Sequence, residues 1–329
     1  MAIQLPRQVT KEKILSTITA ITRIMECEDD PLEIDCQRTE FIDPLGLCLL
    51  LHAGLDAKED WDQEVNFLGF QPNILSYIER MDVFKHLGIS SGLRINRNDR
   101  SDRLVETRIV KSEDEMEETA DSLARALVGS IKTEHSIDPS MEVQPRENAL
   151  KNIKYILAET LANSLTHANR GARATDAKVY VSAQYFEKND RVVLAIVDNG
   201  QGIRSSLQRV KPELRDPSKD IEAIQEALKP GVSCNPTVGT GIETSNQGIG
   251  LTVCHQMVSK AQGNTMLGSG QGALHTMKSQ SREINLQSYW EGTFFVADVP
   301  RSRLLEVDME AIFSSLEDDD AEPELYFED

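Results

Sequence analysis

The chain has 329 residues, a length that suggests about two domains, and 40% of the residues are hydrophobic, which is ample for packed cores. No apolar run is long enough to span a membrane, because the longest, residues 45–55, is short and contains His52. The net charge of −19 argues against nonspecific attraction to nucleic acids and to anionic membranes.

The N-terminus and the cysteines give the expected location. The first 13 residues carry charges where a signal peptide needs an apolar core, so we expect a cytoplasmic protein. Five cysteines are scattered without a CxxC pair, which argues against a zinc site and against a disulfide framework. They are expected to be reduced thiols, mostly in the core.

The first part of the chain alternates strand and helix patterns. Residues 32–36 and 64–70 look like strands, and an apolar helix after Gly46 lies between them. Pro72 is well placed to begin a second helix, which Gly88 can end. This is β-α-β-α order over residues 1–90, and the polar residues 91–103 are expected to form a linker.

A second α/β segment follows the linker. We expect a hairpin joined at residues 188–189, and a long connection over residues 204–247 that contains one amphipathic helix. The other expected elements, in chain order, are a strand at 103–110, a helix at 113–132, a loop at 138–145, a helix from about residue 146, a helix at 251–263 and a strand at 292–300.

The chain ends in an acidic segment, which we assign to residues 309–329. Eight acids and no base lie between residues 317 and 329, so the other 316 residues carry −11 of the net charge. Such a composition is typical of a solvated tail. Tyr326 and Phe327 within it could instead anchor a partner protein.

Three polar residues recur at four-residue intervals in the helix "YILAETLANSLTHANRG". Glu159, Asn163 and His167 therefore share one stripe of that helix. A solvated stripe on a surface helix would have the same pattern, so this helix alone does not define a site.

Two glycine-containing motifs follow. "DNGQGI" begins with Asp198 at the end of a strand, and Gly200 and Gly202 after it would let the backbone approach a flat ligand closely. "NQGIGL" places Gly248 and Gly250 before a helix, where free N–H groups suit phosphate. Each motif alone also fits an ordinary turn or helix entry, and neither is a dinucleotide-binding or Walker motif.

Together and in this order, the three motifs resemble the N, G1 and G2 boxes of the GHKL ATPase superfamily. The resemblance covers residues 104–308 and implies a Bergerat-fold α/β sandwich, with a mixed sheet covered by helices on one face. The compact connection resembles the anti-sigma-factor-kinase and histidine-kinase-like branch, with a lid at about residues 204–247.

The resemblance and the chemistry of the side chains together assign roles to these residues. ATP and Mg²⁺ are the expected ligands, with Glu159 as general base and Asn163 as the metal ligand. His167 is either a phosphate contact or a structural histidine, and Lys211 and Lys229 are expected to be exposed lid lysines rather than phosphate contacts. The residues expected to bind the nucleotide are Asp198, Gly200, Gly202, Gly248, Gly250, Thr293 and His167.

The segment "EFIDPLGLCLLL" resembles the STAS domain of anti-sigma-factor antagonists, over residues 1–90. In regulatory members a Ser or Thr after the Asp accepts phosphate, but Pro44 and Leu45 stand there and have no hydroxyl. This STAS-like domain is therefore expected to dock a partner or its own ATPase domain. A plain βαβ structural domain is the alternative.

The expected function is a Mg-dependent ATPase in which lid closure controls the binding of partner proteins, encoded nearby. The alternative is a serine/threonine kinase that acts on a separate STAS-type or regulatory protein. A sensor histidine kinase is less favoured, because none of the six histidines lies in a dimerisation-helix setting. A protein that binds no nucleotide and a homodimer both stay open.

Overall fold

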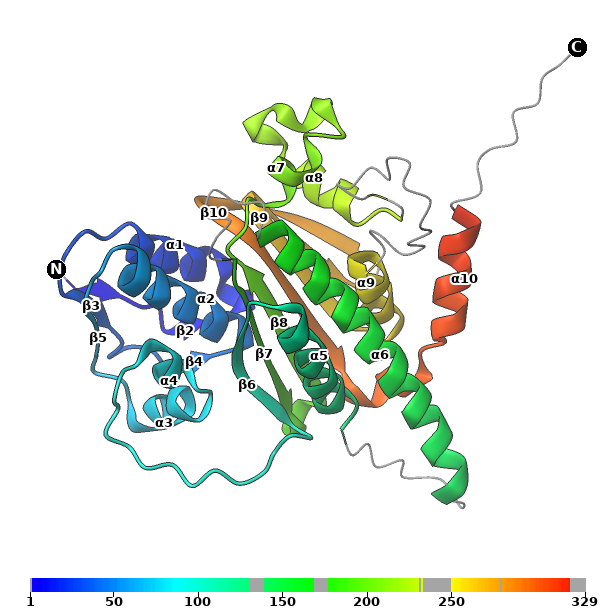
Figure 1. Ribbon diagram of the computed structural model, residues 1–329, viewed down its shortest axis with the longest axis horizontal. Helices are drawn as coiled ribbons and strands as arrows, with labels where there is room; N and C mark the ends of the chain where they lie inside the picture. Colours follow the sequence, from blue (N-terminus) through cyan, green and yellow to red (C-terminus); the bar gives the residue numbers. More distant parts are fainter. Residues whose placement is uncertain are drawn as a thin grey trace, which may run out of the picture.

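The computed structural model describes residues 2–129, 139–168, 177–230, 232, 250–278 and 280–319. Within these ranges, the side chains of residues 139–146, 148, 167, 305 and 316–319 are not described. Figure 1 shows the N-terminal part of the chain lying on one side of a larger sheet, whose other side carries the long helices. In the described ranges, no helix is both long and apolar enough to cross a membrane.

The N-terminal part alternates strands and helices, as the sequence predicts. Its strands are β1 (Ile3–Gln4), β2 (Gln8–Val9), β3 (Leu32–Asp35), β4 (Phe41–Ile42) and β5 (Val65–Leu68). Its helical segments are η1 (Lys11–Lys13), α1 (Ile14–Met25), α2 (Pro44–Leu55), η2 (Asp56–Asp60), α3 (Pro72–Arg80) and α4 (Val83–Leu87). A parallel sheet has the order β1-β3-β5, and β2 pairs in parallel with β4. Parallel neighbours need crossover connections, which these helices supply.

Helix α2 is buried along its whole length. Asp43 precedes it, and the carboxylate accepts hydrogen bonds from the Gly46 backbone at 2.8 Å and from the Lys11 backbone at 2.9 Å. A side chain at Gly46 would collide with the carbonyl oxygen of Val9, so only glycine allows this approach. All twelve residues are buried, which a helix achieves when it lies between two layers.

The helix predicted after Pro72 is two helices. α3 ends before Met81, and Asp82 has a left-handed backbone conformation (φ 61°) that breaks the helix before α4 begins. Arg97 and Lys85 form ion pairs with the carboxylate of Asp82, which holds this break. Gly88 ends α4 with a φ of 64°, as predicted.

The second part of the chain is built on a five-stranded sheet in the order β6-β7-β8-β10-β9. The strands are β6 (Leu104–Val110), β7 (Val179–Phe186), β8 (Arg191–Asp198), β9 (Asn264–Met277) and β10 (Gln280–Pro300). All four pairings are antiparallel, so the expectation of a mixed sheet is wrong. β8 and β9 do run in the same direction, but the hairpin places β10 between them, so they never pair.

Helices complete the α/β architecture, which confirms the predicted fold class. They are α5 (Glu113–Val128), α6 (Pro139–Ala168), α7 (Ile203–Leu207), α8 (Asp220–Ala227), α9 (Gly250–Lys260) and α10 (Met309–Asp319). Short turns lie at η4 (Glu187–Asn189), η5 (Pro212–Arg215), η6 (Pro217–Lys219) and η7 (Arg301–Glu306).

Two boundaries differ from the sequence prediction. Helix α6 begins at Pro139, so the loop expected at residues 138–145 is mostly helix, and proline is well tolerated in a first helical turn. The segment assigned to the tail from residue 309 begins with α10, whose Met309 and Ile312 are buried. Their spacing puts both on one face, and Phe313 beside them packs against Tyr155 of α6 at a ring-centroid distance of 6.4 Å.

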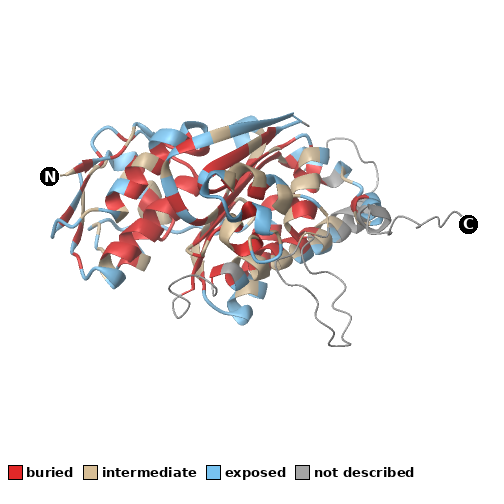
Figure 2. Ribbon diagram, turned by 90° about the horizontal axis from the view of Figure 1, so that it is seen from above, coloured by how far each residue is buried: buried red, intermediate tan, exposed pale blue. Residues whose placement is uncertain are grey.

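The sheet is buried on both faces. On β8, residues 192, 194 and 196 belong to the core formed with α5, α6 and α9, while residues 193, 195 and 197 belong to the core of the N-terminal part. This alternation is the period of a strand. Helices of the second part cover one face, as predicted, and α1 and α2 cover the other (Figures 1 and 2). The N-terminal part thus docks on the five-stranded sheet of its own chain, one of the two arrangements expected.

Aromatic and charged side chains join the two parts. Trp290 of β10 is fully buried and meets His52 of α2 edge-on, with ring centroids 5.4 Å apart. His52 also contacts the Tyr180 hydroxyl of β7 through its Nδ1 atom at 3.3 Å. The buried ammonium of Lys11 lies 2.9 Å from the carboxylate of Asp298 on β10.

We predict that Trp290→Ala lowers the free energy of unfolding by about 3–5 kcal/mol, because a buried indole leaves a cavity at the contact between the two parts. Urea denaturation followed by circular dichroism measures this. Tyr289→Ala is the matched control, since its side chain is half exposed and its removal should change stability by less than about 0.5 kcal/mol. Equal losses in the two variants would contradict the shared core.

Candidate functional site

One end of the sheet brings together three residues on neighbouring strands. In the strand pairing, Thr293 of β10 lies opposite Asp198 of β8 and also opposite Ser269 of β9. Strand alternation puts all three on the face that carries α5, α6 and α9. Asp198 and Thr293 are both predicted site residues. They are 95 residues apart in the chain, and the strand pairing makes them direct neighbours.

The carboxylate of Asp198 is buried and held by backbone donors. Its Oδ1 atom accepts hydrogen bonds from the backbone N–H of Gly200 at 2.9 Å and of Thr293 at 3.2 Å. Burial raises the pKa of the Asp198 carboxyl to about 7, although these hydrogen bonds act in the opposite direction. A buried carboxylate fixed in this way is suited to accept a hydrogen bond from a ligand.

The turn after Asp198 requires glycine at two positions. Gly202 has a φ of 78°, and a Cβ there would lie 2.6 Å from the Ser269 hydroxyl. Gly292, just before Thr293, has a φ of 97°, and a Cβ there would lie 2.1 Å from the carbonyl oxygen of Asp198. The two chain segments therefore approach each other more closely than any side chain would allow.

Ser269 and Asn199 hold this turn in place, and sequence reasoning did not identify either role. The Ser269 hydroxyl accepts from the Ile203 backbone at 2.9 Å and donates to the Gly292 carbonyl at 2.8 Å. The side-chain oxygen of Asn199 accepts from the Lys178 backbone at 2.8 Å. Asn199 stands within the quoted "DNGQGI", but the Ser269 contact depends on strand register, which no local pattern shows.

Glu159 and Gly250 meet where α6 crosses α9. Gly250 is the first residue of α9, and a Cβ there would lie 2.8 Å from the Cβ of Glu159 and 3.2 Å from the backbone nitrogen of Thr160. Glycine at position 250 is therefore needed for this helix contact. The sequence suggests a different reason for it, namely contact with a phosphate. Glu159 is half-buried, and burial raises the pKa of its carboxyl above the ordinary value.

The remaining predicted residues fall into three groups. Asn163 is half-buried one helical turn after Glu159, and its side-chain oxygen is a ligand type that suits Mg²⁺. The His167 side chain and Gly248 lie outside the described residues. Lys211 and Lys229 both form ion pairs with Glu226; Lys229 is exposed as expected, whereas Lys211 is half-buried.

Part of the predicted lid is docked on the sheet. Asp220, at the start of α8, accepts from the Gln271 backbone of β9 at 2.8 Å and pairs with Arg204 at 2.7 Å. Gly270 has a φ of 63°, and a Cβ there would collide with the Asp220 carboxylate. Helices α7 and α8 of the predicted lid thus pack against β9, while residues 231 and 233–249 lie outside the described part of the chain.

The described cysteines are free thiols, most of them in the core, as the sequence predicts. Cys36, Cys48 and Cys254 are buried free thiols, Cys27 is half-buried and free, and Cys234 lies outside the described residues. Within the described ranges, no three His, Cys, Asp or Glu side chains gather as a metal cluster. A Mg²⁺ ion held by one amide oxygen and by substrate phosphates needs no such cluster.

We predict that Asp198→Asn stabilises the protein at alkaline pH. The folded pKa of about 7 exceeds the unfolded value of about 3.9, so the folded form keeps a proton that the unfolded form has lost. The stabilisation that the Asp198 carboxyl contributes is fully present below its unfolded-state pKa, and it is lost as the pH rises through its folded-state pKa. The advantage of the variant should therefore grow by about 1 kcal/mol between about pH 6 and about pH 8.5.

Urea denaturation across that pH range tests this linkage. Asp114→Asn, at an exposed position in the first turn of α5, serves as the control and should follow the wild type at every pH. A stability difference between Asp198→Asn and the wild type that does not change with pH would contradict the raised pKa.

Comparison with known protein families agrees with this geometry. Residues 149–302 match the family described as histidine kinase-, DNA gyrase B-, and HSP90-like ATPase. No curated protein matches the chain. The matched segment contains Glu159, Asn163, Asp198 and Thr293, whereas β6 and α5 lie before it although they belong to the same sheet and core. Residues 149–302 therefore form a GHKL-type ATPase domain.

Proposed function

We propose that this protein is a regulatory ATPase that binds ATP with Mg²⁺ and hydrolyses it. The observation that carries the proposal is the buried Asp198 carboxylate, held between Gly200 and Thr293 at the end of β8. A carboxylate in that place would accept a hydrogen bond from the adenine amino group. Gly202 and Gly292 allow the two chain segments to close tightly around this carboxylate, because a side chain at either position would collide with the opposite segment.

The catalytic step is assigned to Glu159. Its half-buried carboxylate, with a raised pKa, would take a proton from the attacking water. Asn163, one turn further along α6, would offer an oxygen to Mg²⁺, which offsets the charge of the phosphates. The N-terminus of α9 begins at Gly250 beside Glu159, and its N–H groups and helix dipole favour an anion there.

The regulatory part of the proposal concerns the N-terminal part, which we interpret as a STAS-like domain. Its Pro44 and Leu45 are buried and carry no hydroxyl, so that position accepts no phosphate. Lys11, His52 and α2 fix this domain to the sheet, which supports a role as a permanent binding surface for a cytoplasmic partner. Closure of residues 204–247 over bound nucleotide would then change the surface offered to that partner.

A serine/threonine kinase would use the same base and metal ligand, so phosphate transfer is the property to test. The protein is incubated with labelled ATP, alone and with the proteins that neighbouring genes encode. Labelled phosphate released into solution, with no labelled protein, supports the ATPase. Label on a serine of a protein encoded by a neighbouring gene would show that the protein is a kinase and would contradict the ATPase assignment.

We predict that Glu159→Ala keeps nucleotide binding and lowers ATP turnover by about 10²–10⁴-fold, the usual contribution of a general base. Alanine keeps the Cβ that contacts α9, so the helix packing stays intact. Glu147→Ala, at an exposed position on the same helix, is the control and should turn over ATP like the wild type. ATP turnover at the wild-type rate in Glu159→Ala would show that Glu159 is not the general base.

We predict that Asp198→Asn weakens ATP binding by about tenfold or more, because the ligand loses a charged hydrogen-bond acceptor. Isothermal titration calorimetry with ATP and Mg²⁺ measures the affinity. The same variant is expected to be more stable than the wild type at alkaline pH, so weak binding in a stable protein separates a lost contact from misfolding. Unchanged affinity would show that the adenine lies elsewhere.

A further inference from the structure

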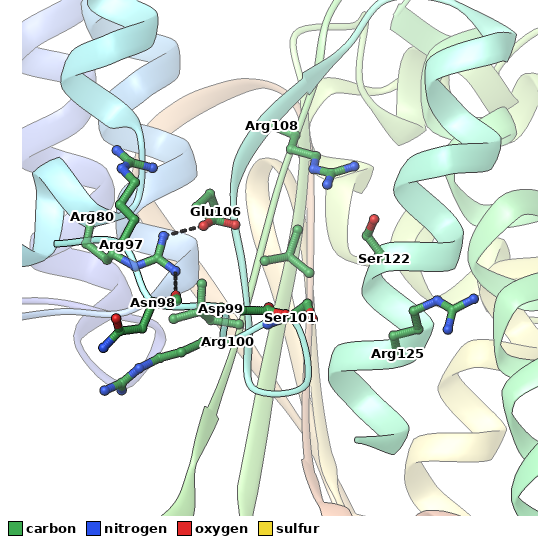
Figure 3. A pocket seen from close by; sticks show the side chains of 12 residues that line it. Arg80, Arg97, Asn98, Asp99, Arg100, Ser101, Glu106, Arg108, Ser122 and Arg125 are labelled. Carbon is green, nitrogen blue, oxygen red and sulfur yellow. Dashed lines mark hydrogen bonds and ion pairs between the residues drawn. The ribbon is translucent and has the colours of Figure 1, made fainter. Parts of the chain in front are cut away.

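A cavity of about 410 Å³ lies where the two parts of the chain and their linker meet. The end of α3 provides Arg80, the linker provides Arg97 and Arg100, the edge strand β6 provides Arg108, and α5 provides Arg125. Figure 3 shows Arg80, Arg97 and Arg100 to one side of β6, and Arg108 and Arg125 to the other. The cavity is far from Asp198 in the chain and shares no residue with the candidate nucleotide site.

The lining of this cavity is rich in arginine although the chain as a whole is acidic. Five arginines line it against two acids, Asp99 and Glu106, and three further acids that pair with these arginines, Asp82, Glu118 and Asp121, lie outside the lining. Leu104 and Val105 provide an apolar floor. A cleft whose lining is dominated by one sign of charge attracts ligands of the opposite sign.

Two of the arginines are held in position by the protein. Arg80 pairs with Glu106 and donates to the Asn98 carbonyl at 3.4 Å. Arg97 pairs with Asp82 and donates to the Glu79 carbonyl at 3.0 Å. Backbone and carboxylate contacts fix these guanidinium planes, which reduces the entropy that a ligand would have to remove.

The other three arginines are available to a ligand. Arg108 and Arg125 pair with Glu118 and Asp121, but these are exposed ion pairs, which contribute little and exchange readily. Arg100 is exposed, and no carboxylate among the described residues pairs with it. A phosphate could therefore displace the surface acids without leaving a buried charge unpaired.

We propose that this cavity binds a small ligand carrying one or more phosphate groups. A volume of about 410 Å³ lies in the range of small-molecule sites, and guanidinium forks match phosphate oxygens two at a time. The ligand would contact α3, the linker, β6 and α5 together, and so tie the N-terminal part to the ATPase sheet at a second place. The proposal is independent of the reaction assigned to Glu159.

Isothermal titration calorimetry of the full chain with inorganic pyrophosphate tests the proposal. Arg100→Gln with Arg108→Gln should weaken binding by at least about tenfold, since charge-assisted hydrogen bonds are the stronger class. Arg125→Lys keeps the charge but loses the fork, and should weaken binding to a smaller extent. Arg303→Gln removes an exposed arginine paired with Glu306 outside the cavity, and should bind like the wild type.

Other outcomes would overturn the proposal. Undetectable binding of pyrophosphate by the wild type would do so, and so would equal affinity in the wild type and the double variant, because the anion would then lie elsewhere. A peptide of residues 317–329 serves as an acidic protein ligand in the same titrations. If that peptide binds through Arg100 and Arg108 while pyrophosphate does not, the cavity is a protein-docking site and not a phosphate site.

Discussion

The indole of Trp290 packs edge-on against His52 of α2, and this contact joins the N-terminal part to the second face of the sheet. Because both faces are covered, side chains of both parities along β8 and β10 are buried. A fully buried leucine contributes roughly 1.5–3 kcal/mol, and α2 places several leucines between the two layers. Neither layer could keep this apolar surface in water, so the two parts depend on each other for burial.

The candidate nucleotide site lies on strands that are held by packing on both faces of the sheet. Val197 and Phe294 are buried toward the N-terminal part, and their chain neighbours Asp198 and Thr293 face the opposite side. The pairing of β9 with β10 is irregular between Trp290 and Thr293, so the contact with α2 lies next to the bend that contains Gly292. A carboxylate with a pKa near 7 costs stability at neutral pH, and the surrounding sheet offsets that cost.

Prediction from sequence was most successful where periodicity and order carry the information. The alternating residues of β7 and β8 and the apolar run of α2 were identified from local patterns, and both occur as expected. The predictions for the start of α6 and for the region of α10 were wrong, because a proline-containing segment and an acidic segment were interpreted as irregular structure. The fully antiparallel order of the five-stranded sheet was also missed, since a local pattern gives strand positions but not the order in which strands pair.

The residue types by themselves determined the chemistry: a carboxylate after a strand, glycines that allow close backbone approach, and a stripe containing Glu159 and Asn163 on one helix. Only the tertiary structure decided that Thr293 and Ser269 lie in line with Asp198, that Gly250 is required for the contact of α9 with α6, and that five arginines line one cavity. These contacts join segments distant in the chain, and their geometry depends on strand register and on packing between layers, which local spacing does not encode.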